Sequence, residues 1–364
     1  MEKCEWNACV STEDQSLARK PAGRRRPYNV KIRMGGKMTS DSASMMARKP
    51  KLTVGEQIAH LKSRGVTFEL CSEEEAAEYL WNANNYLRAA SYRKLYPRQI
   101  DGPNPGSYIN LDFEDLIELS SIDRRLREAL LAASIDVEHF AKMELMRRCD
   151  ERGEDGYSVV SDYLISLSPR RRDHLEASLK ARGGSGGAHD EYSGSLISHY
   201  AGEYPIWVFL EVVDFGTFAD LWRFCALRWA DKQMKSEHYV LKSVKALRNA
   251  CAHNSLLVNG FSHGAPRASY QPPRLVSDSL NRHGVKNTKA RREKLGNLRM
   301  SQIAATLCSV DTYCSLESTV RRHSARFAAV REYAEHCGVL SRASGDVVSF
   351  FEFMWKLVDV WLYV

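Results

Sequence analysis

Residues 111–150 read LDFEDLIELSSIDRRLREALLAASIDVEHFAKMELMRRCD, and this stretch decides the fold. Apolar side chains recur in it every three to four residues, from Phe113 through Val137 to Met143, which is the period of an α-helix. A helix of this length needs neighbours that bury its apolar stripe. We therefore expect a central packing helix, with Ser134 as the candidate site of a bend.

The rest of the chain carries the same helical pattern. Capping boxes at Thr53 and Ser72 predict the start of two more helices, the second running to about residue 94. Three helical patterns close the chain, over about 298–313, 316–337 and 345–363. No long run alternates apolar and polar residues as a strand does, so we predict an all-α helical bundle. The last helix is rich in aromatic residues that would serve dimerisation if exposed: Phe350, Phe351, Phe353, Trp355 and Trp361.

The positive charge of the chain is concentrated in two stretches. Its 364 residues are 44% hydrophobic, enough for a sizeable core, and carry a net charge of +7. Residues 1–48 hold ten Lys and Arg against five acids, and residues 261–300 hold nine against two. These stretches are either flexible arms that contact a polyanion or solvated tails.

Cysteine usage and hydropathy bound the compartment and the cofactors. The nine cysteines are scattered without a Cys-x-x-Cys pair, which is typical of a reducing cytosol and not of a disulfide scaffold or zinc site. No apolar run reaches membrane-spanning length, and the first residues lack the apolar core of a signal peptide. We expect a soluble cytoplasmic protein with no cofactor, no metal and no membrane partner.

The segment Leu247–His253 carries the residues most suited to chemistry. It closes a helical run that begins near Glu237 and contains Arg248, Asn249 and His253. Arginine presents permanently charged planar donors to phosphate oxygens, and histidine exchanges protons near neutral pH. Asn249 and His253 share a helix face, so the amide could orient the imidazole, whereas Arg248 lies about 140° from His253 on an ideal helix.

These residue types fit RNA cleavage without a metal ion. The imidazole would move the proton of a ribose 2′-hydroxyl or of the leaving oxygen, and the guanidinium would stabilise charge on phosphorus. In-line cleavage uses both an acid and a base, so two copies of a site with one histidine predict a homodimer. The alternative is a helix C-terminus with a cation near its dipole. The pair Arg331 and His336 has the same spacing.

Several segments resemble the Abi-like family of bacterial abortive-infection proteins. Residues 248–255, RNACAHNS, resemble its RNxCAH(H/N)S signature, and residues 49–62, KPKLTVGEQIAHLK, resemble its opening segment. Further similar segments follow in family order: NYLR with SY at 85–92, DRRLR at 123–127, and PIWV with EVVDFG at 205–216.

The resemblance implies a HEPN-superfamily helical bundle whose Arg-polar-x3-His motif marks metal-independent RNases. It assigns catalysis to Arg248, His253 and Asn249, with supporting positions at Glu138, Lys142 and Asn254. The chain departs from the family where a second histidine and an arginine often follow the motif, because Asn254 and Leu256 stand in this region. That departure leaves open a non-catalytic RNA-binding protein that works with a partner RNA. A nucleotidyl-transferring enzyme is a weaker alternative, since no phosphate-loop motif is present.

The candidate RNA contacts come from three basic places. They are Arg88, the run Arg170, Arg171 and Arg172, and the positions Lys289, Arg291 and Arg292. The predicted organisation is a disordered tail at 1–48, a HEPN domain at 49–260, a flexible basic insert at 261–297, and helices at 298–364 that pack on the bundle. The leading hypothesis is an endoribonuclease of antiviral defence.

Overall fold

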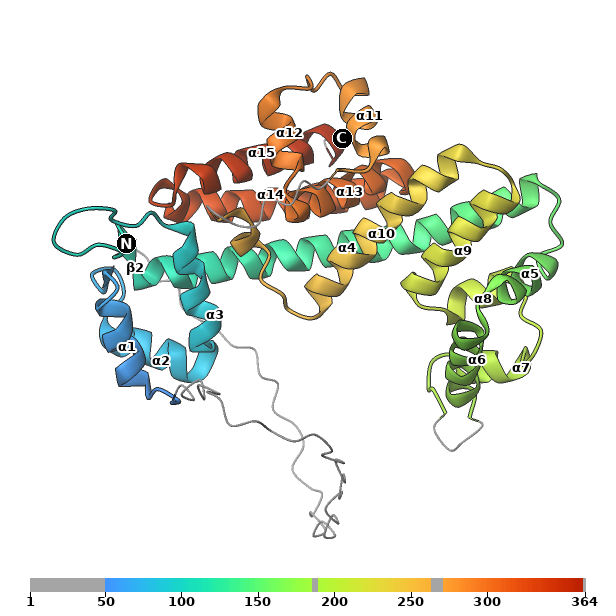
Figure 1. Cartoon of the computed structure of the whole chain (residues 1–364), viewed down its shortest axis with the longest axis horizontal. Helices are drawn as coiled ribbons and strands as arrows, with labels where there is room; N and C mark the ends of the chain where they lie inside the picture. The colour runs from blue at the N-terminus through green and yellow to red at the C-terminus, as the bar shows by residue number, and fades with distance from the viewer. Residues whose placement is uncertain (1–49, 185–188, 263–270, 363–364) are drawn as a thin grey trace, which may run out of the picture. The chain divides into compact units, whose positions relative to one another are not determined.

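The computed structural model describes residues 50–184, 189–262 and 271–362. The elements below belong to one compact unit, residues 51–364 (Figure 1). The predicted tail at 1–48 lies outside the described residues, and the proposed division at 260/261 and 297/298 stays a prediction. The described α-helices are α1 (Val54–Lys62), α2 (Glu73–Glu78), α3 (Tyr86–Ser91), α4 (Phe113–Glu151), α5 (Ser158–Ser166), α6 (Pro169–Arg182), α7 (Gly194–His199), α8 (Ile206–Val212), α9 (Phe215–Arg228), α10 (Lys232–Ala252), α11 (Arg274–Arg282), α12 (Lys289–Leu295), α13 (Leu298–Tyr313), α14 (Glu317–His336) and α15 (Gly345–Leu362).

The all-α prediction is confirmed, with little else between the helices. One π-helical turn, η1 (Tyr79–Ala83), follows α2, and short 3-10 segments are η2 (Tyr92–Leu95), η3 (Val258–Phe261) and η4 (Val339–Ser341). Two short strands, β1 (Val66–Thr67) and β2 (Leu111–Asp112), pair in parallel with Val66 opposite Leu111.

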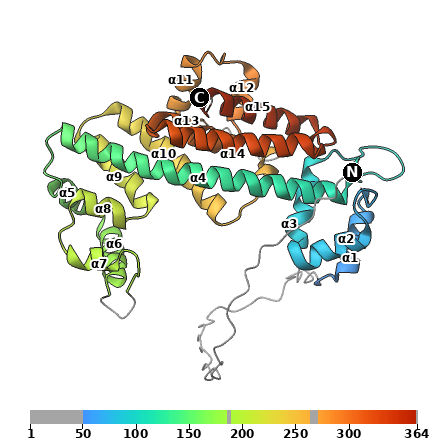
Figure 2. The same cartoon turned by 180° about the vertical axis from the view of Figure 1, so that it is seen from behind.

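Helix α4 is the central packing helix that the sequence predicts. It is a continuous α-helix of 39 residues that runs through Ser134 without a break, and Asp112 caps its first turn by accepting from the Glu114 backbone N–H. Figures 1 and 2 both show α4 lying along α13 and α14. Every residue of α13 from Met300 to Val310 is buried, because α4, α10 and α15 all pack around it.

An ion pair sets how α10 lies against α4. Arg148 of α4 donates from Nη1 to Glu237 Oε2 at 2.7 Å and from Nη2 to Glu237 Oε1 at 3.2 Å. The same guanidinium lies 5.0 Å from the ring centre of Trp222 in α9. A planar fork on a carboxylate is geometrically specific, so this contact holds the first part of α10 in one register against α4.

The prediction of one helix from residue 72 to about residue 94 is wrong in the middle of that range. Both capping boxes are present, and α1 and α2 begin where the sequence predicts. The helix stops at Asn84, whose Nδ2 donates to the Tyr79 hydroxyl at 2.9 Å and to Ser120 Oγ of α4 at 3.1 Å. Asn85 then caps α3. Because the chain restarts on another axis, Leu87 of α3 has 77% of its surface exposed.

Two expectations about the C-terminal third need correction. The basic insert is not a flexible loop over its described part, because α11 and α12 form there and Val276, Leu280 and Leu295 are buried. The aromatics of α15 are not an exposed dimerisation face: Phe351, Trp355 and Trp361 are buried, and Phe350 stacks on Phe261 at 5.1 Å. The sequence pattern did not distinguish an aromatic face against a neighbouring helix from one against a second chain.

The described cysteines are core thiols, and the described residues form neither a metal site nor a membrane span. Seven cysteines in the described ranges are free thiols, all buried except the half-buried Cys337. The described residues contain no group of three or more His, Cys, Asp or Glu side chains placed to hold a metal ion. Within the same ranges, no helix combines the length and apolar character needed to cross a membrane.

Candidate active site

Helix α10 carries the Arg248–His253 segment at its C-terminal end. It begins at Lys232, five residues before the predicted start, because Asp231 caps it by accepting from the backbone N–H groups of Gln233 and Met234. Its apolar face is buried along the whole length of the helix, and the helix packs against α9, α13 and α4. The segment therefore projects from a rigid element, which is what a preorganised site requires.

The chain leaves α10 through a defined turn. His253 is the C-cap, and Asn254 adopts a left-handed conformation with φ 54°. The backbone N–H of Ser255 donates to the Ala250 carbonyl at 2.8 Å, and that of Asn254 donates to the Cys251 carbonyl at 3.0 Å. These two bonds form a Schellman motif, in which asparagine is the usual substitute for glycine. The position of the second family histidine is thus filled here by a turn residue.

Asp123 of α4 clamps the segment that follows the turn. Its Oδ1 accepts from the backbone N–H groups of Leu257 at 2.9 Å and Val258 at 2.8 Å. Its Oδ2 accepts from the Tyr92 hydroxyl at 2.9 Å and from the Arg127 guanidinium. The carboxylate is fully buried. A buried charge with this many donors fixes its partners strongly, so the backbone behind His253 is held to α4.

Arg88 of α3 holds the turn from the other side. Its Nη1 donates to the Asn254 carbonyl at 2.5 Å, and its Nη2 lies 4.0 Å from Asp123 Oδ2. The sequence placed Arg88 among the RNA contacts. In the structure its guanidinium bonds the backbone next to His253, and we interpret it as a positioning residue.

Arg248 has no acidic partner among the described residues. Its only hydrogen bond there runs from Nη1 to Asn249 Oδ1 at 3.2 Å, and its buried Nε has no acceptor. Arginine is rarely buried without a carboxylate partner, and the Arg248 side chain is partly buried. A guanidinium without one keeps its full charge available for an anionic ligand.

His253 is exposed and its imidazole makes no hydrogen bond within the described part of the chain. Its backbone N–H donates to the Asn249 carbonyl at 2.9 Å. The Asn249 side chain, expected to orient the imidazole, is bonded to Arg248 instead. Asn249 therefore connects the two candidate catalytic residues through its side chain on one side and its backbone on the other.

Two other residues of α10 are excluded from the chemistry by burial. Burial raises the pKa of the Cys251 thiol to about 12, so thiolate is scarce at neutral pH. Burial also lowers the pKa of His238, whose Nδ1 lies 2.9 Å from the Ala219 carbonyl. His238 is thus a neutral core residue, unlike the exposed His253.

A hollow of about 570 Å³ lies on the exposed face of α10 beside Asn249. Lys242 and Lys245 line it from α10, and Arg171 lines it from α6. Arg171 is paired with Asp220, whereas neither lysine is paired with a carboxylate in the described ranges. Neither lysine was among the residues predicted for the site, although their spacing of seven and four residues before Asn249 puts them on its helix face.

Comparison with known families identifies the chain. The model of the family described as Abi-like protein matches residues 78–259, half of the chain. The chain belongs to the Abi-like family. The matched region contains Arg88, Asp123, Arg248 and His253, so it covers the whole clamped site, and it ends in the segment that Asp123 holds. Neither a curated protein nor a solved structure matches the chain.

The other predicted residues of this Abi-like protein lie apart from the site. Glu138 and Lys142 pair with each other at 3.1 Å on α4, are about 15% exposed, and make no bond to Arg248 or His253 among the described residues. Arg170 is exposed, and Arg172 Nε lies 4.0 Å from Glu176.

The three positions in the basic insert differ from one another. Arg291 is buried and donates to the Ser277 and Val285 carbonyls and to Asn281 Oδ1, so it stabilises the fold of the insert. Lys289 and Arg292 are exposed; Lys289 Nζ lies 3.9 Å from Glu293 Oε1, and Arg292 Nη1 donates to the Asn287 carbonyl at 2.9 Å.

Proposed function

We propose that this Abi-like protein is a metal-independent endoribonuclease of the HEPN superfamily. It would cleave single-stranded RNA in the bacterial cytoplasm as an effector of abortive infection, the defence role that membership of the family suggests. One observation carries the proposed chemistry. Arg248, whose guanidinium has no carboxylate partner in the described part of the chain, lies close in sequence to the exposed imidazole of His253, at a helix end that Asp123 and Arg88 hold in place.

The proposed reaction uses the ribose as its own nucleophile. The His253 imidazole accepts the proton of a 2′-hydroxyl, and the 2′ oxygen attacks the adjacent phosphorus in line. The bond from phosphorus to the 5′ oxygen breaks, and that oxygen takes a proton from an acid. The products are a 2′,3′-cyclic phosphate and a 5′-hydroxyl. Arg248, steadied by Asn249, stabilises the charge that grows on the phosphoryl oxygens.

The acid would come from a second copy of the chain. One protomer supplies a single histidine to this site, and two facing copies supply His253 as base and His253 of the other copy as acid. We therefore propose a homodimer as the active form. Single strands and loops are the proposed substrates, because in-line attack needs a backbone that can rotate.

The decisive experiment measures product chemistry. Purified protein is incubated with a single-stranded RNA in EDTA, beside His253→Ala and Arg248→Ala. The expected result is 2′,3′-cyclic phosphate ends from the wild type alone, and no cut at a position carrying a 2′-deoxyribose. Cleavage by all three proteins alike, or cleavage at the deoxy position, would overturn the proposal.

A second candidate function is RNA binding without cleavage. The turn residue Asn254 at the position of the family's second histidine favours it, and so do the unpaired lysines of the hollow beside Asn249. In that case the wild type and His253→Ala bind RNA equally and neither cuts. The double variant Lys242→Gln, Lys245→Gln should weaken binding, whereas Lys235→Gln, an exposed lysine earlier on α10, should not.

A further inference from the structure

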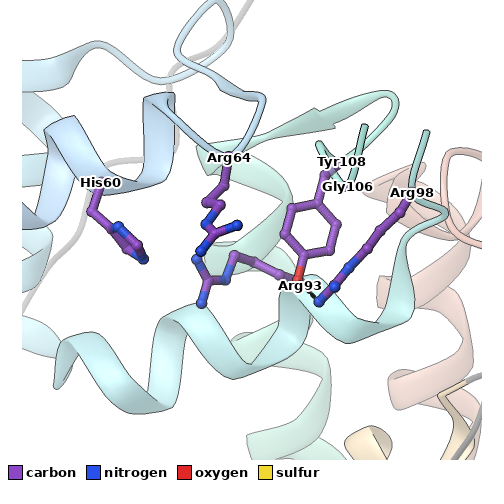
Figure 3. Close-up of a pocket in the computed structure, with 6 residues that line it drawn as sticks. All are labelled: His60, Arg64, Arg93, Arg98, Gly106 and Tyr108. Carbon is purple, nitrogen blue, oxygen red and sulfur yellow. Dashed lines mark hydrogen bonds between the residues drawn. The ribbon is translucent and has the colours of Figure 1, made fainter. Parts of the chain in front are cut away.

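A second cationic site lies at the N-terminal end of the unit, outside the candidate active site. A small pocket of about 160 Å³ is lined by His60 of α1, Arg64 of the turn after it, Arg93 of η2, and the loop residues Arg98, Gly106 and Tyr108. Figure 3 shows the four basic side chains and the Tyr108 ring converging on this space from separate segments. Family resemblance and the sequence motifs assign no role to it.

The pocket has no acidic side chain to balance its charge. None of Arg64, Arg93 and Arg98 forms an ion pair with a carboxylate in the part of the chain that the structure describes. Like charges gathered in a partly enclosed space repel one another more strongly than in open water. Such an arrangement persists when other contacts hold the groups together, and it is relieved when an anion binds.

Tyr108 is the contact that holds the arginines together. Its backbone N–H donates to the Arg64 carbonyl at 2.8 Å, and its hydroxyl accepts from Arg98 Nη2 at 2.7 Å. The guanidinium carbons of Arg98 and Arg93 lie 4.9 Å and 5.7 Å from the centre of its ring. Cations over an aromatic ring at these distances are attracted to it. The pocket is therefore built around one buried tyrosine and is not a chance collection of surface arginines.

The backbone of the turn reinforces this order. Gly65 has φ +83°, and a Cβ there would lie 2.9 Å from the Tyr108 carbonyl oxygen. Only glycine allows this close approach, and the approach fixes the residue before it, Arg64, beside the loop that carries Arg98. Arg93 is held separately, because its Nε donates to the Ala90 carbonyl at 2.7 Å.

We propose that this pocket binds a single phosphate group. Three guanidinium groups offer planar pairs of N–H donors, which match phosphate oxygens better than any other common anion. The Tyr108 hydroxyl accepts from Arg98 and keeps its own proton to donate. The volume admits a phosphate group and not a nucleoside, since pockets for larger ligands are about 300 Å³ or more.

The surroundings indicate that the phosphate is the 5′ end of an RNA strand, a point that rests on the proposed function. Arg98 also lines a second hollow, of about 1140 Å³, together with Lys94, Arg299 and one acidic residue, Asp346. That hollow reaches Leu256 and Asn259, in the segment that follows His253 and is clamped by Asp123. A strand with a phosphate in the small pocket would thus extend along basic side chains toward the candidate active site.

The first test uses inorganic phosphate as the probe and does not depend on RNA or cleavage. Calorimetric titration should show saturable binding to the wild type, and about tenfold weaker binding to Arg64→Gln, whose side chain has no hydrogen bond to the protein in the described ranges. Arg326→Gln, an exposed arginine on α14, is the matched control and should bind like the wild type. Thermal unfolding confirms that each variant folds. No saturable binding in the millimolar range, or equal binding by Arg64→Gln, overturns the pocket.

The second test identifies the source of the phosphate. His253→Ala, which would leave a strand uncut, is titrated with 5′-phosphorylated and 5′-hydroxyl forms of one short RNA. Tighter binding of the phosphorylated form, lost on adding Arg64→Gln, supports an RNA end. Phosphate binding without any preference between the two RNAs keeps the pocket and overturns the RNA end as its ligand. If the wild type does not cleave RNA, or cleaves it no faster than His253→Ala, the proposed function fails while the pocket stands.

His60 offers a spectroscopic readout of the same event. Burial, together with the charges of Arg93 and Arg64, lowers the pKa of its imidazole, so the ring is neutral at pH 7 in the free protein. A phosphate dianion would raise that pKa, so the imidazole resonance should titrate at higher pH with phosphate than without it. The other groups that face the pocket are Arg98, Tyr86 and Tyr108. An imidazole resonance that titrates identically with and without phosphate would contradict binding at this pocket.

Discussion

The chain contains two segments with one arginine, four intervening residues and one histidine, and they differ in the charge around the arginine. Arg331 of α14 pairs with Glu335 at 3.2 Å and Asp359 at 3.0 Å, and its guanidinium lies 5.9 Å from the Trp355 ring centre. Arg248 of α10 bonds only Asn249 among the described residues. The same spacing thus produces a neutralised surface cation in one helix and an available one in the other.

The two histidines differ in how their surroundings are held. His253 is followed by backbone that the buried Asp123 fixes through two N–H groups. His336 ends α14, which leads through Gly338, with φ 66°, into η4, where Val339 is buried and its carbonyl accepts from the Tyr96 hydroxyl at 3.4 Å. An arginine and a histidine five positions apart on a helix are therefore not enough to form an active site. What distinguishes the candidate site is that Arg248 has no carboxylate partner among the described residues, whereas Arg331 has two.

The largest expected difference between the two segments is in RNA cleavage. Arg248→Ala and His253→Ala should each lower the rate on single-stranded RNA by about 10²- to 10⁴-fold, because each removes a group that acts on the reacting phosphate. Arg331→Ala and His336→Ala should cleave at the wild-type rate. Initial rates in EDTA, with circular dichroism to confirm folding, measure both sets. Equal losses from the two segments would mean that the comparison has no catalytic meaning.

The next difference concerns the carboxylates beside the two segments. Asp123→Ala should lower the free energy of unfolding by about 3–5 kcal/mol, because it leaves Arg127 and two backbone N–H groups without their buried partner. Asp359→Ala removes a half-exposed partner of Arg331 and should cost at most about 1 kcal/mol. Urea denaturation measures both values. A small loss for Asp123→Ala would show that the segment behind His253 is not clamped as described.

Local patterns in the sequence predicted where most helices lie. The features that they did not predict depend on contacts between residues far apart in the chain. The capping boxes at Thr53 and Ser72 and the apolar spacing of α4 depend on residues within a few positions, and they appear as predicted. The break at Asn84 depends on Ser120 of another helix, so no local pattern contains it.

The candidate site divides in the same way. Arg248 and His253 were visible in one short motif. The Asp123 clamp joins residues 134 positions apart, and the role of Arg88 depends on a carbonyl 166 positions away. The hollow with Lys242 and Lys245 also needs α6 and α9 beside α10. From the sequence alone, only the spacing that puts the two lysines on the helix face of Asn249 could be predicted.

A carboxylate placed beside Arg248 would give it the kind of partner that Arg331 has, and would test whether the charge of Arg248 must be free. Glu335 lies four residues after Arg331, and the exposed Ala252 lies four residues after Arg248. Ala252→Glu should therefore pair with Arg248 and lower the cleavage rate by about two- to fivefold. Ala252→Gln is the matched control and should leave the rate unchanged, since it adds the same bulk without charge. If Gln slows the reaction as much as Glu, steric crowding and not the charge of Arg248 is the cause.

The smallest effect is expected from the cysteine in or next to each segment, Cys251 and Cys337. Burial raises the pKa of Cys251 to about 12, and burial also raises the pKa of the half-buried Cys337 beside His336. Near neutral pH both thiols stay protonated, since a raised pKa moves ionisation to higher pH. Cys251→Ala and Cys337→Ala should therefore leave the cleavage rate and its pH profile unchanged. Loss of the alkaline part of the profile in Cys251→Ala alone would assign a proton-transfer role to the thiol, and the chemistry could then no longer be ascribed to Arg248 and His253 by themselves.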